Sequence, residues 1–194
     1  WGQRMNDGAT VDMMVGALTD PFDRVHMGIT AENIAAKWQI SREEQDAFAA
    51  ESHRRALHAI RNNHFKEQIL PIEVASHKET IVFDTDEHPR ENTSEDHLAK
   101  LRPVFQKDGT VTAGNASGIN DCAAALVLME YKAAQKRNLK PLARLVSYGH
   151  AGVDPRFMGM GPVPAVQSAL RRAGLRMSDM DVIESNEAFA VQAC

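Results

Sequence analysis

After Pro141 the sequence alternates short apolar runs with helical patterns, and this alternation limits the folds open to the chain. Residues 142–148 are predicted to form a strand, residues 164–173 a helix, and residues 182–184 a second buried strand. Gly174 is placed to cap the helix at its C-terminal end. A strand, a helix and a second strand in this order are typical of a parallel sheet with a right-handed crossover. The pattern predicts a layered α/β fold.

Two helices are predicted earlier in the chain. The first spans residues 31–39, where Thr30 can cap the helix and apolar side chains recur at helical spacing. The second begins after Ser41, because Ser41 and Glu44 form the sequence pattern of a capping box, and it extends to about Asn62. This reciprocal cap is the clearest local signal in the chain.

Between the second helix and Pro141 the patterns are shorter. The candidate elements there are strands at 69–74, 80–83 and 123–129 and a helix at 130–138. Residues 84–100 are charged and rich in turn formers, so they are predicted to be a surface excursion. Residues 109–118, GTVTAGNASG, are so small that another group must approach the backbone closely there.

Composition argues against several classes of protein. The net charge of −4, from 22 Lys and Arg against 26 Asp and Glu, disfavours a protein that binds duplex nucleic acid. No run approaches the roughly 18–20 apolar residues of a membrane span, and the start lacks the apolar core of a signal peptide. We therefore expect a cytoplasmic protein without a membrane segment.

Cysteine and histidine positions predict neither a disulfide framework nor a metal site. Cys122 and Cys194 are the only cysteines, and they do not form the paired motifs of a zinc ribbon. His53, His58 and His64 lack the spacing that places metal-binding imidazoles on one helical face.

Two local patterns point to a ligand site and leave its chemistry open. Asn186 lies at a predicted junction of strand and helix, where its carboxamide can be a plain helix cap or can position a water or an oxyanion. Residues 159–164, GMGPVP, partly match a dinucleotide fingerprint. However, Pro164 replaces the third glycine, which lets helix and strand pack closely. A nicotinamide-dependent dehydrogenase is therefore the weaker interpretation.

Four motifs, taken together, resemble those of bacterial biosynthetic thiolases. They are HMGITAEN at 26–33, the small-residue segment 109–121, DPRFMGMGP at 154–162 and NEAFA at 186–190, and they follow one another in the family's order. The resemblance covers essentially the whole chain. It is nearest to the acetyl-CoA acetyltransferases and the β-ketothiolases.

This resemblance implies a layered αβαβα fold built from two similar halves, with a coenzyme A-binding excursion inserted into the first. It assigns residues 1–118 to this loop domain, 119–140 to the end of the N-terminal core domain and 141–194 to the start of the C-terminal core domain. The sequence starts at Trp1 rather than Met and stops at Cys194 within the apolar face of a predicted helix. We therefore expect a piece of a longer chain.

Thiolases act by Claisen chemistry through an acyl-thioester on a cysteine. The thiolate attacks a 3-ketoacyl-CoA, expels acetyl-CoA and passes the acyl group to coenzyme A, and the reverse direction forms acetoacetyl-CoA. In the family, the nucleophile lies upstream of the segment that this chain resembles, and the Gly-His-Pro histidine and a second cysteine lie downstream. His150, Cys122 and Cys194 match none of these motifs. The chain alone is expected to be inactive.

The resemblance also implies one catalytic residue and a ligand wall. Asn186 matches the family asparagine that holds a water in the oxyanion hole for the thioester carbonyl. The positions that match the wall of the coenzyme A and acyl tunnel are Leu18, His26, Met27, Arg90, Leu101, Phe105, Ala113, Ser117, Ile119, Met158, Ala188 and Phe189. Arg90 suits a nucleotide phosphate. His97 and Val104 depart from the smaller residues that the family has at these positions.

Coenzyme A and acyl-CoA are the implied ligands, both as substrates, and no covalently bound cofactor is implied. The complete protein is expected to form a homodimer or homotetramer. A noncatalytic thiolase-like protein that carries acyl-CoA is the second hypothesis. A cysteine nucleophile elsewhere in the complete sequence would decide for the enzyme.

Overall fold

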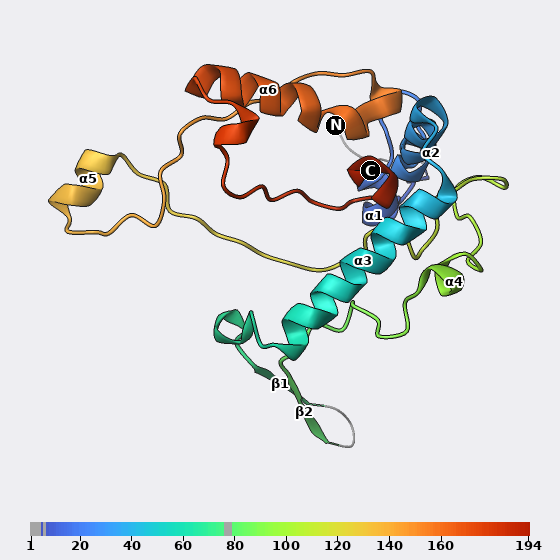
Figure 1. The fold of residues 1–194 in the computed structure, drawn as a ribbon, viewed down its shortest axis with the longest axis horizontal. Helices are drawn as coiled ribbons and strands as arrows, with labels where there is room; N and C mark the ends of the chain where they lie inside the picture. The colour runs from blue at the N-terminus through green and yellow to red at the C-terminus, as the bar shows by residue number, and fades with distance from the viewer. Residues whose placement is uncertain (1–4, 6, 76–78) are drawn as a thin grey trace. The chain divides into compact units, whose positions relative to one another are not determined.

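The longest element is helix α3 (Arg42–Arg61), which begins where the sequence predicts it (Figure 1). The Ser41 hydroxyl accepts from the Glu44 amide at 3.1 Å, and the Glu44 carboxylate accepts from the Ser41 amide at 2.7 Å. Both halves of the predicted capping box are therefore formed. The helix ends at Arg61 with Asn62 as its C-cap residue, close to the predicted end.

Replacing Ser41 by alanine removes the oxygen that accepts from the Glu44 amide. We expect this variant of the full-length protein to lose about 1 kcal/mol of unfolding free energy, measured by urea denaturation. Ser41→Thr is the control, because it keeps a hydroxyl at the cap and should stay close to the wild type. Equal stability of the two variants would contradict a stabilising cap.

The described residues form two compact units, and each is considered by itself. The first unit comprises Trp1–Gly118, Pro155–Phe157 and Glu187–Cys194, and the second comprises Ile119–Asp154 and Met158–Asn186. The structure is a computed structural model that describes residues 5, 7–75 and 79–194. Residues 1–4, 6 and 76–78, which belong to the expected loop domain, lie outside the described residues.

Helix α2 (Met27–Trp38) begins earlier than the sequence predicts. Thr30 was a wrong choice of cap, because its hydroxyl donates back to the Met27 carbonyl at 2.7 Å inside the first turn. The cap is His26, whose Nδ1 accepts from the Gly28 amide at 3.0 Å. Imidazole can serve as this acceptor only in the tautomer that carries its proton on Nε2.

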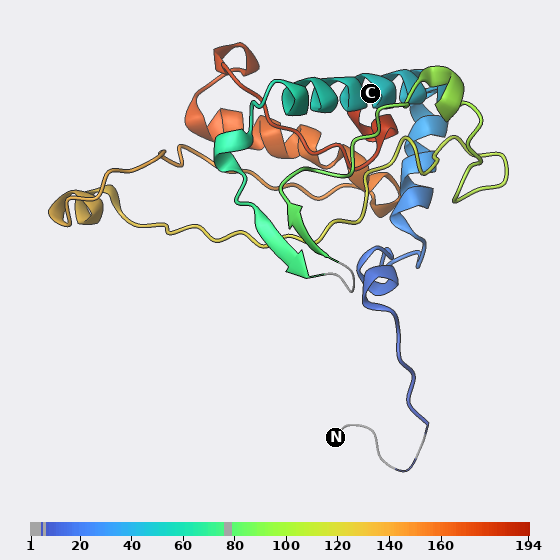
Figure 2. The same ribbon diagram turned by 90° about the horizontal axis from the view of Figure 1, so that it is seen from below.

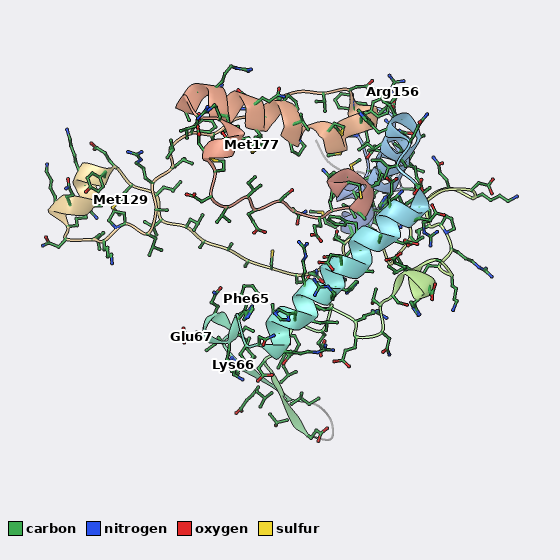
Figure 3. The ribbon with its side chains drawn as sticks, in the orientation of Figure 1. Phe65, Lys66, Glu67, Met129, Arg156 and Met177 are labelled. Carbon is green, nitrogen blue, oxygen red and sulfur yellow. The ribbon has the colours of Figure 1, made fainter. Side chains whose placement is uncertain are left out.

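The segment Pro155–Phe157 packs against α2. The Asn33 side chain donates to the Arg156 carbonyl at 3.1 Å, and Figure 3 labels Arg156 near this helix. The Trp38 and Phe157 rings meet edge to face with centroids 5.7 Å apart. Residues 155–157 of the 154–162 motif therefore belong to the first unit.

Short elements complete the helical part of the first unit. They are α1 (Met13–Ala17), η1 (Lys66–Gln68), α4 (Glu95–Leu98) and α7 (Ala190–Ala193). Figure 2 shows α4 next to the N-terminal end of α3, and Figure 3 labels Phe65, Lys66 and Glu67 in the turn that follows α3. The buried apolar side chains of this unit come from α2, α3, α4, α7 and the 109–118 loop: Ala31, Ile34, Ala35, Ala49, Leu98, Val111, Ala190 and Val191.

Strands β1 (Ile72–Ala75) and β2 (Thr80–Phe83) form an antiparallel hairpin. Both candidate strands of this region are thus confirmed, the first with a later start than the predicted 69–74. Ile72 pairs with Phe83 and Val74 pairs with Ile81, so one face of the hairpin is apolar. All four of these side chains are exposed.

In the second unit the helices are confirmed. They are α5 (Tyr131–Lys136) and α6 (Pro162–Ala173). A short 3-10 helix, η3 (Met177–Asp179), follows α6. Another, η2 (Pro155–Met160), includes residues of both units. Gly174 adopts a left-handed conformation with φ of 68°, and the Leu175 amide returns to the Leu170 carbonyl at 3.0 Å. This is the predicted C-terminal cap.

The predicted strands of the second unit are wrong for this structure. Residues 123–129, 142–148 and 182–184 are neither helix nor strand, and Leu126, Leu142 and Val182 are at least 84% exposed. Figure 1 shows α5 at the end of two long segments of this kind. A strand requires a neighbouring strand with which its backbone pairs, and these segments have none among the described residues. The expected parallel layered sheet is therefore not formed there.

Candidate functional site

An isolated antiparallel bridge before α2 gathers three of the predicted ligand-wall residues. The bridge joins Thr19 to His26, and the Met27 amide donates to the Leu18 carbonyl at 2.9 Å. These contacts place Leu18, His26 and Met27 side by side at the start of the helix. All three side chains are half-buried.

Phe105 connects this group to the C-terminal part of the chain. Its ring stacks on the His26 imidazole with centroids 4.7 Å apart and meets the Phe189 ring edge to face at 6.3 Å. The stack depends on Gly28, because a Cβ at this position would overlap the Phe105 ring. His26, Phe105 and Phe189 are called the aromatic cluster below.

Replacing Gly28 by alanine is expected to push Phe105 away from His26. Overpacking of this kind costs about 1–3 kcal/mol of unfolding free energy. We expect the full-length protein to show this loss of stability in urea denaturation. Gly16→Ala is the matched control, because a Cβ there meets only a Val11 methyl group at 3.7 Å. Indistinguishable behaviour of the two variants would contradict the tight contact.

The 109–118 loop pairs with the segment that precedes α7. The Ser117 amide donates to the Ala188 carbonyl at 3.0 Å, and an antiparallel bridge joins Ala116 to Phe189. The Ala190 amide donates to the Asn115 carbonyl at 2.9 Å. Ser117, Ala188 and Phe189, which lie far apart in the sequence, are thereby brought together.

Leu101 and Ala113 belong to two segments that run beside each other. A bridge joins Pro103 to Thr112, and the Val104 amide donates to the Val111 carbonyl at 3.0 Å. Gly114, the neighbour of Ala113, lies against the Leu98 and Leu101 side chains so closely that a Cβ would not fit. The predicted small-residue segment therefore does admit a close approach, here by leucine side chains.

Two buried carboxylates support the loop, and the sequence patterns pointed to neither. The Glu32 carboxylate, on α2, accepts from the Thr110 amide and hydroxyl and from the Val111 amide at 2.8–3.0 Å. The Asp46 carboxylate, on α3, accepts from the Asn115 carboxamide at 2.9 Å and from Arg42 at 2.7 Å. Both acids are at most 5% exposed. For Asp46 the available signal was an acidic residue on the apolar face of a predicted helix, and Glu32 carried no such signal.

Arg90 lies elsewhere on the first unit, beside α3. Its amide donates to Nδ1 of His53 at 3.2 Å, and the His88 ring stacks on the His53 ring with centroids 6.1 Å apart. Burial lowers the pKa of His53, and the nearby His88 and Arg90 lower it further, whereas Glu187 raises it. A lowered pKa favours the neutral form of His53, so the positive charge at this place comes from the Arg90 guanidinium itself.

The remaining predicted site residues, Ile119, Met158 and Asn186, belong to the second unit, and each is exposed. Helix α7 begins at Ala190 with Phe189 as its N-cap residue. The interpretation of Asn186 as a plain helix cap is therefore wrong. Its assignment to an oxyanion hole stays a prediction.

Cys194 does not have the surroundings of an activated nucleophile. Burial raises the pKa of the Cys194 thiol, and the nearby Glu44 raises it further, whereas an activated cysteine needs a lowered pKa. Cys122 is exposed.

The described residues, 5, 7–75 and 79–194, lack two kinds of feature. No group of three or more His, Cys, Asp and Glu side chains in this part of the chain lies close enough together to hold a metal ion. Within the same residues no helix has the length and apolar character to cross a membrane.

Comparison with protein families decides the identity of the chain at the family level. The family model described as "Thiolase, N-terminal domain" matches residues 1–132, and "Thiolase, C-terminal domain" matches residues 139–194. The chain belongs to the thiolase family. This confirms the resemblance drawn from the four motifs.

Thiolases of several organisms are similar to this chain over its whole length. The β-ketothiolase BktB of Cupriavidus necator is 63% identical over 195 residues, which cover 100% of this chain and 50% of that protein. The acetyl-CoA acetyltransferase of Syntrophomonas wolfei is 54% identical over 196 residues, covering 100% of this chain and 49% of that protein. The chain spans about half the length of the curated relatives it matches.

Solved thiolase structures match the fold. The crystal structure of the Bacillus anthracis acetyl-CoA acetyltransferase aligns with a TM-score of 0.87 at 48% identity and covers 100% of this chain and 49% of that chain. Human mitochondrial 3-ketoacyl-CoA thiolase in complex with CoA aligns with a TM-score of 0.85 at 46% identity and covers 100% and 48%. The described part of the chain therefore has the architecture of the corresponding part of a thiolase.

Proposed function

We propose that the complete protein is an acyltransferase of the thiolase type. It cleaves a 3-ketoacyl-CoA with coenzyme A, or in reverse condenses acetyl groups to acetoacetyl-CoA. Membership of the family and similarity to a β-ketothiolase and to acetyl-CoA acetyltransferases support this reaction class. The observation that carries the proposal for this chain is the pairing of Ser117 with Ala188 beside the aromatic cluster.

The proposed ligand is coenzyme A or an acyl-CoA, held by a wall from the first unit. Ala113, Ser117 and Ala188 have small side chains that leave room for the narrow pantetheine arm, while Phe105 and Phe189 offer apolar surface to the acyl thioester. Arg90, whose amide donates to His53, carries a guanidinium that suits a nucleotide phosphate. The complex of CoA with the human mitochondrial enzyme is consistent with this class of ligand.

In the proposed mechanism Asn186 holds a water whose O–H donates to the thioester carbonyl oxygen. In thiolysis the cysteine thiolate adds to the C3 keto carbon of the substrate, and the bond between C2 and C3 then breaks. The departing acetyl-CoA carries negative charge on this thioester oxygen as an enolate until it takes up a proton at C2. A positioned donor therefore stabilises the transition state more than the ground state. The attacking cysteine and the histidine that activates it are assigned to parts of the complete protein outside this chain. Ile119 and Met158 complete the proposed tunnel wall.

Further features of the complete protein belong to the same proposal. Residues 1–118 are assigned to the coenzyme A-binding loop domain, 119–140 to the end of the N-terminal core domain and 141–194 to the start of the C-terminal core domain. The complete protein is assigned to the cytoplasm as a homodimer or homotetramer, which sedimentation of the purified protein would test.

The reaction is tested by incubating the full-length protein, and separately this chain, with acetoacetyl-CoA and coenzyme A. We expect the full-length protein to form acetyl-CoA and this chain to form none. Appreciable thiolysis by this chain alone would contradict the assignment of the nucleophile to another part of the protein. Binding of coenzyme A without turnover by the full-length protein would favour the acyl-CoA carrier instead.

A further inference from the structure

Asn115 is the residue at which α3, the 109–118 loop and the segment before α7 meet. Its carboxamide nitrogen donates to Asp46 Oδ1 at 2.9 Å and to the Thr110 carbonyl at 3.0 Å, and its carboxamide oxygen accepts from the Thr112 amide at 2.8 Å. Its backbone carbonyl accepts from the Ala190 amide at 2.9 Å. Asn115 is 3% exposed, so these bonds allow it a single orientation.

Asp46 holds Asn115 from the helix side. One carboxylate oxygen accepts from Asn115, and the other accepts from Arg42 Nε at 2.7 Å. Arg42 also donates to the Leu98 and Leu101 carbonyls at 2.6 and 3.0 Å. A buried carboxylate with both oxygens bonded to fixed partners holds these partners in one geometry.

The segments held in this way carry the proposed ligand wall. Ser117 follows Asn115 by two residues and pairs with Ala188, and Phe189 pairs with Ala116. Asn186 precedes this pairing in the sequence by only two residues. Displacement of Asn115 would therefore move both sides of the pairing.

We propose that Asp46 and Asn115 are positioning residues that fix the 109–118 loop and the 188–190 segment to each other. The part of the proposed ligand wall formed by Ser117 and Ala188 then keeps one geometry. The expected effect on catalysis rests on the proposed function, whereas the coupling of the two segments does not.

The first test is Asp46→Asn in the full-length protein. An amide at position 46 offers one acceptor oxygen in place of two, so the bond with Asn115 or the bond with Arg42 is lost. We expect the amides of Ser117 and Ala190 to exchange hydrogen about tenfold faster. We also expect KM for coenzyme A to rise about tenfold, with a smaller fall in kcat.

A reciprocal exchange supplies the rescue. Asn115→Asp brings two carboxylates together and removes both bonds that the carboxamide nitrogen donates. The double variant Asp46→Asn with Asn115→Asp restores a donor opposite an acceptor. We expect its KM for coenzyme A to lie closer to the wild-type value than that of Asn115→Asp. If Asn115→Asp fails to fold, recovery of folding by the double variant supports the proposal equally. A double variant that neither folds better nor has a lower KM than Asn115→Asp counts against the proposal.

Glu51→Gln is the matched control, because it neutralises a carboxylate on the same helix that pairs with Arg54 and Arg55 at the surface. The positioning role is wrong if Asp46→Asn changes KM and amide exchange no more than this control. It is also wrong if Asp46→Asn lowers stability and leaves KM unchanged. If the wild-type protein has no thiolase activity but Asp46→Asn still accelerates exchange at Ser117 and Ala190, the proposed function fails and the coupling stands.

Discussion

Replacing Asn186 by alanine in the full-length protein is expected to lower kcat for thiolysis by about 10²–10³-fold. Without the carboxamide, the water proposed to stabilise the thioester oxyanion loses its anchor. An interaction of this kind is stronger in the transition state than in the ground state, so kcat falls much more than the affinity for substrate. Steady-state kinetics with acetoacetyl-CoA and coenzyme A measure both parameters.

Asn62→Ala is a suitable control for this variant. Asn62 is exposed at the end of α3, where its side chain donates to the His58 carbonyl at 2.8 Å. We expect this control to keep the wild-type kcat. An Asn186→Ala variant that kept its kcat and changed only KM would assign Asn186 to substrate binding and not to the oxyanion hole.

The second large effect is expected for Glu32→Ala. This substitution removes the acceptor for the Thr110 and Val111 amides, and Val111 is fully buried. Unpaired buried donors and the cavity left by the side chain together cost about 3–5 kcal/mol. Chemical denaturation of the full-length protein measures the loss, and hydrogen exchange of the Val111 amide locates it in the loop.

Glu32→Gln separates the loss of the bonds from the loss of the charge. Glutamine keeps the side-chain volume and one acceptor oxygen for the two amides, so we expect a loss of about 1–2 kcal/mol. If Glu32→Ala were no less stable than Glu32→Gln, the carboxylate would not be what holds the 109–118 loop on α2.

Elements fixed by neighbouring residues could be predicted from the sequence. The Ser41 capping box and the Gly174 cap depend on contacts within one helical turn, and both are formed. The start of α2 was missed because His26 caps it. An imidazole is not among the usual capping side chains, and only its tautomer makes it an acceptor.

Strand predictions succeeded or failed according to where the partner lies. Strands β1 and β2 are close in sequence and pair with each other. The runs at 123–129, 142–148 and 182–184 have the apolar composition of buried strands, but among the described residues none has a neighbouring strand. The composition of a segment indicates whether it can be buried. Whether it forms a strand depends on a partner strand that lies far away in the sequence.

The candidate site also has parts that could be predicted from the sequence and parts that could not. The motifs predicted that Ser117, Ala188 and Phe189 share a wall, and the structure brings these three residues together. The support by Glu32 and Asp46 could not be predicted, because their partners lie 78 and 69 residues away. A helical pattern shows which face is apolar, and only the docked loop determines which acidic side chains of the helix find buried donors.

The central claim is that the 113–117 segment and the 188–190 segment together form one wall of an acyl-CoA tunnel. A crystal structure of the full-length protein with bound coenzyme A tests it most directly. We predict that the pantetheine arm lies against Ala113 and Ser117, with its thiol end toward Phe189. Coenzyme A bound at a surface that includes neither segment would contradict the claim.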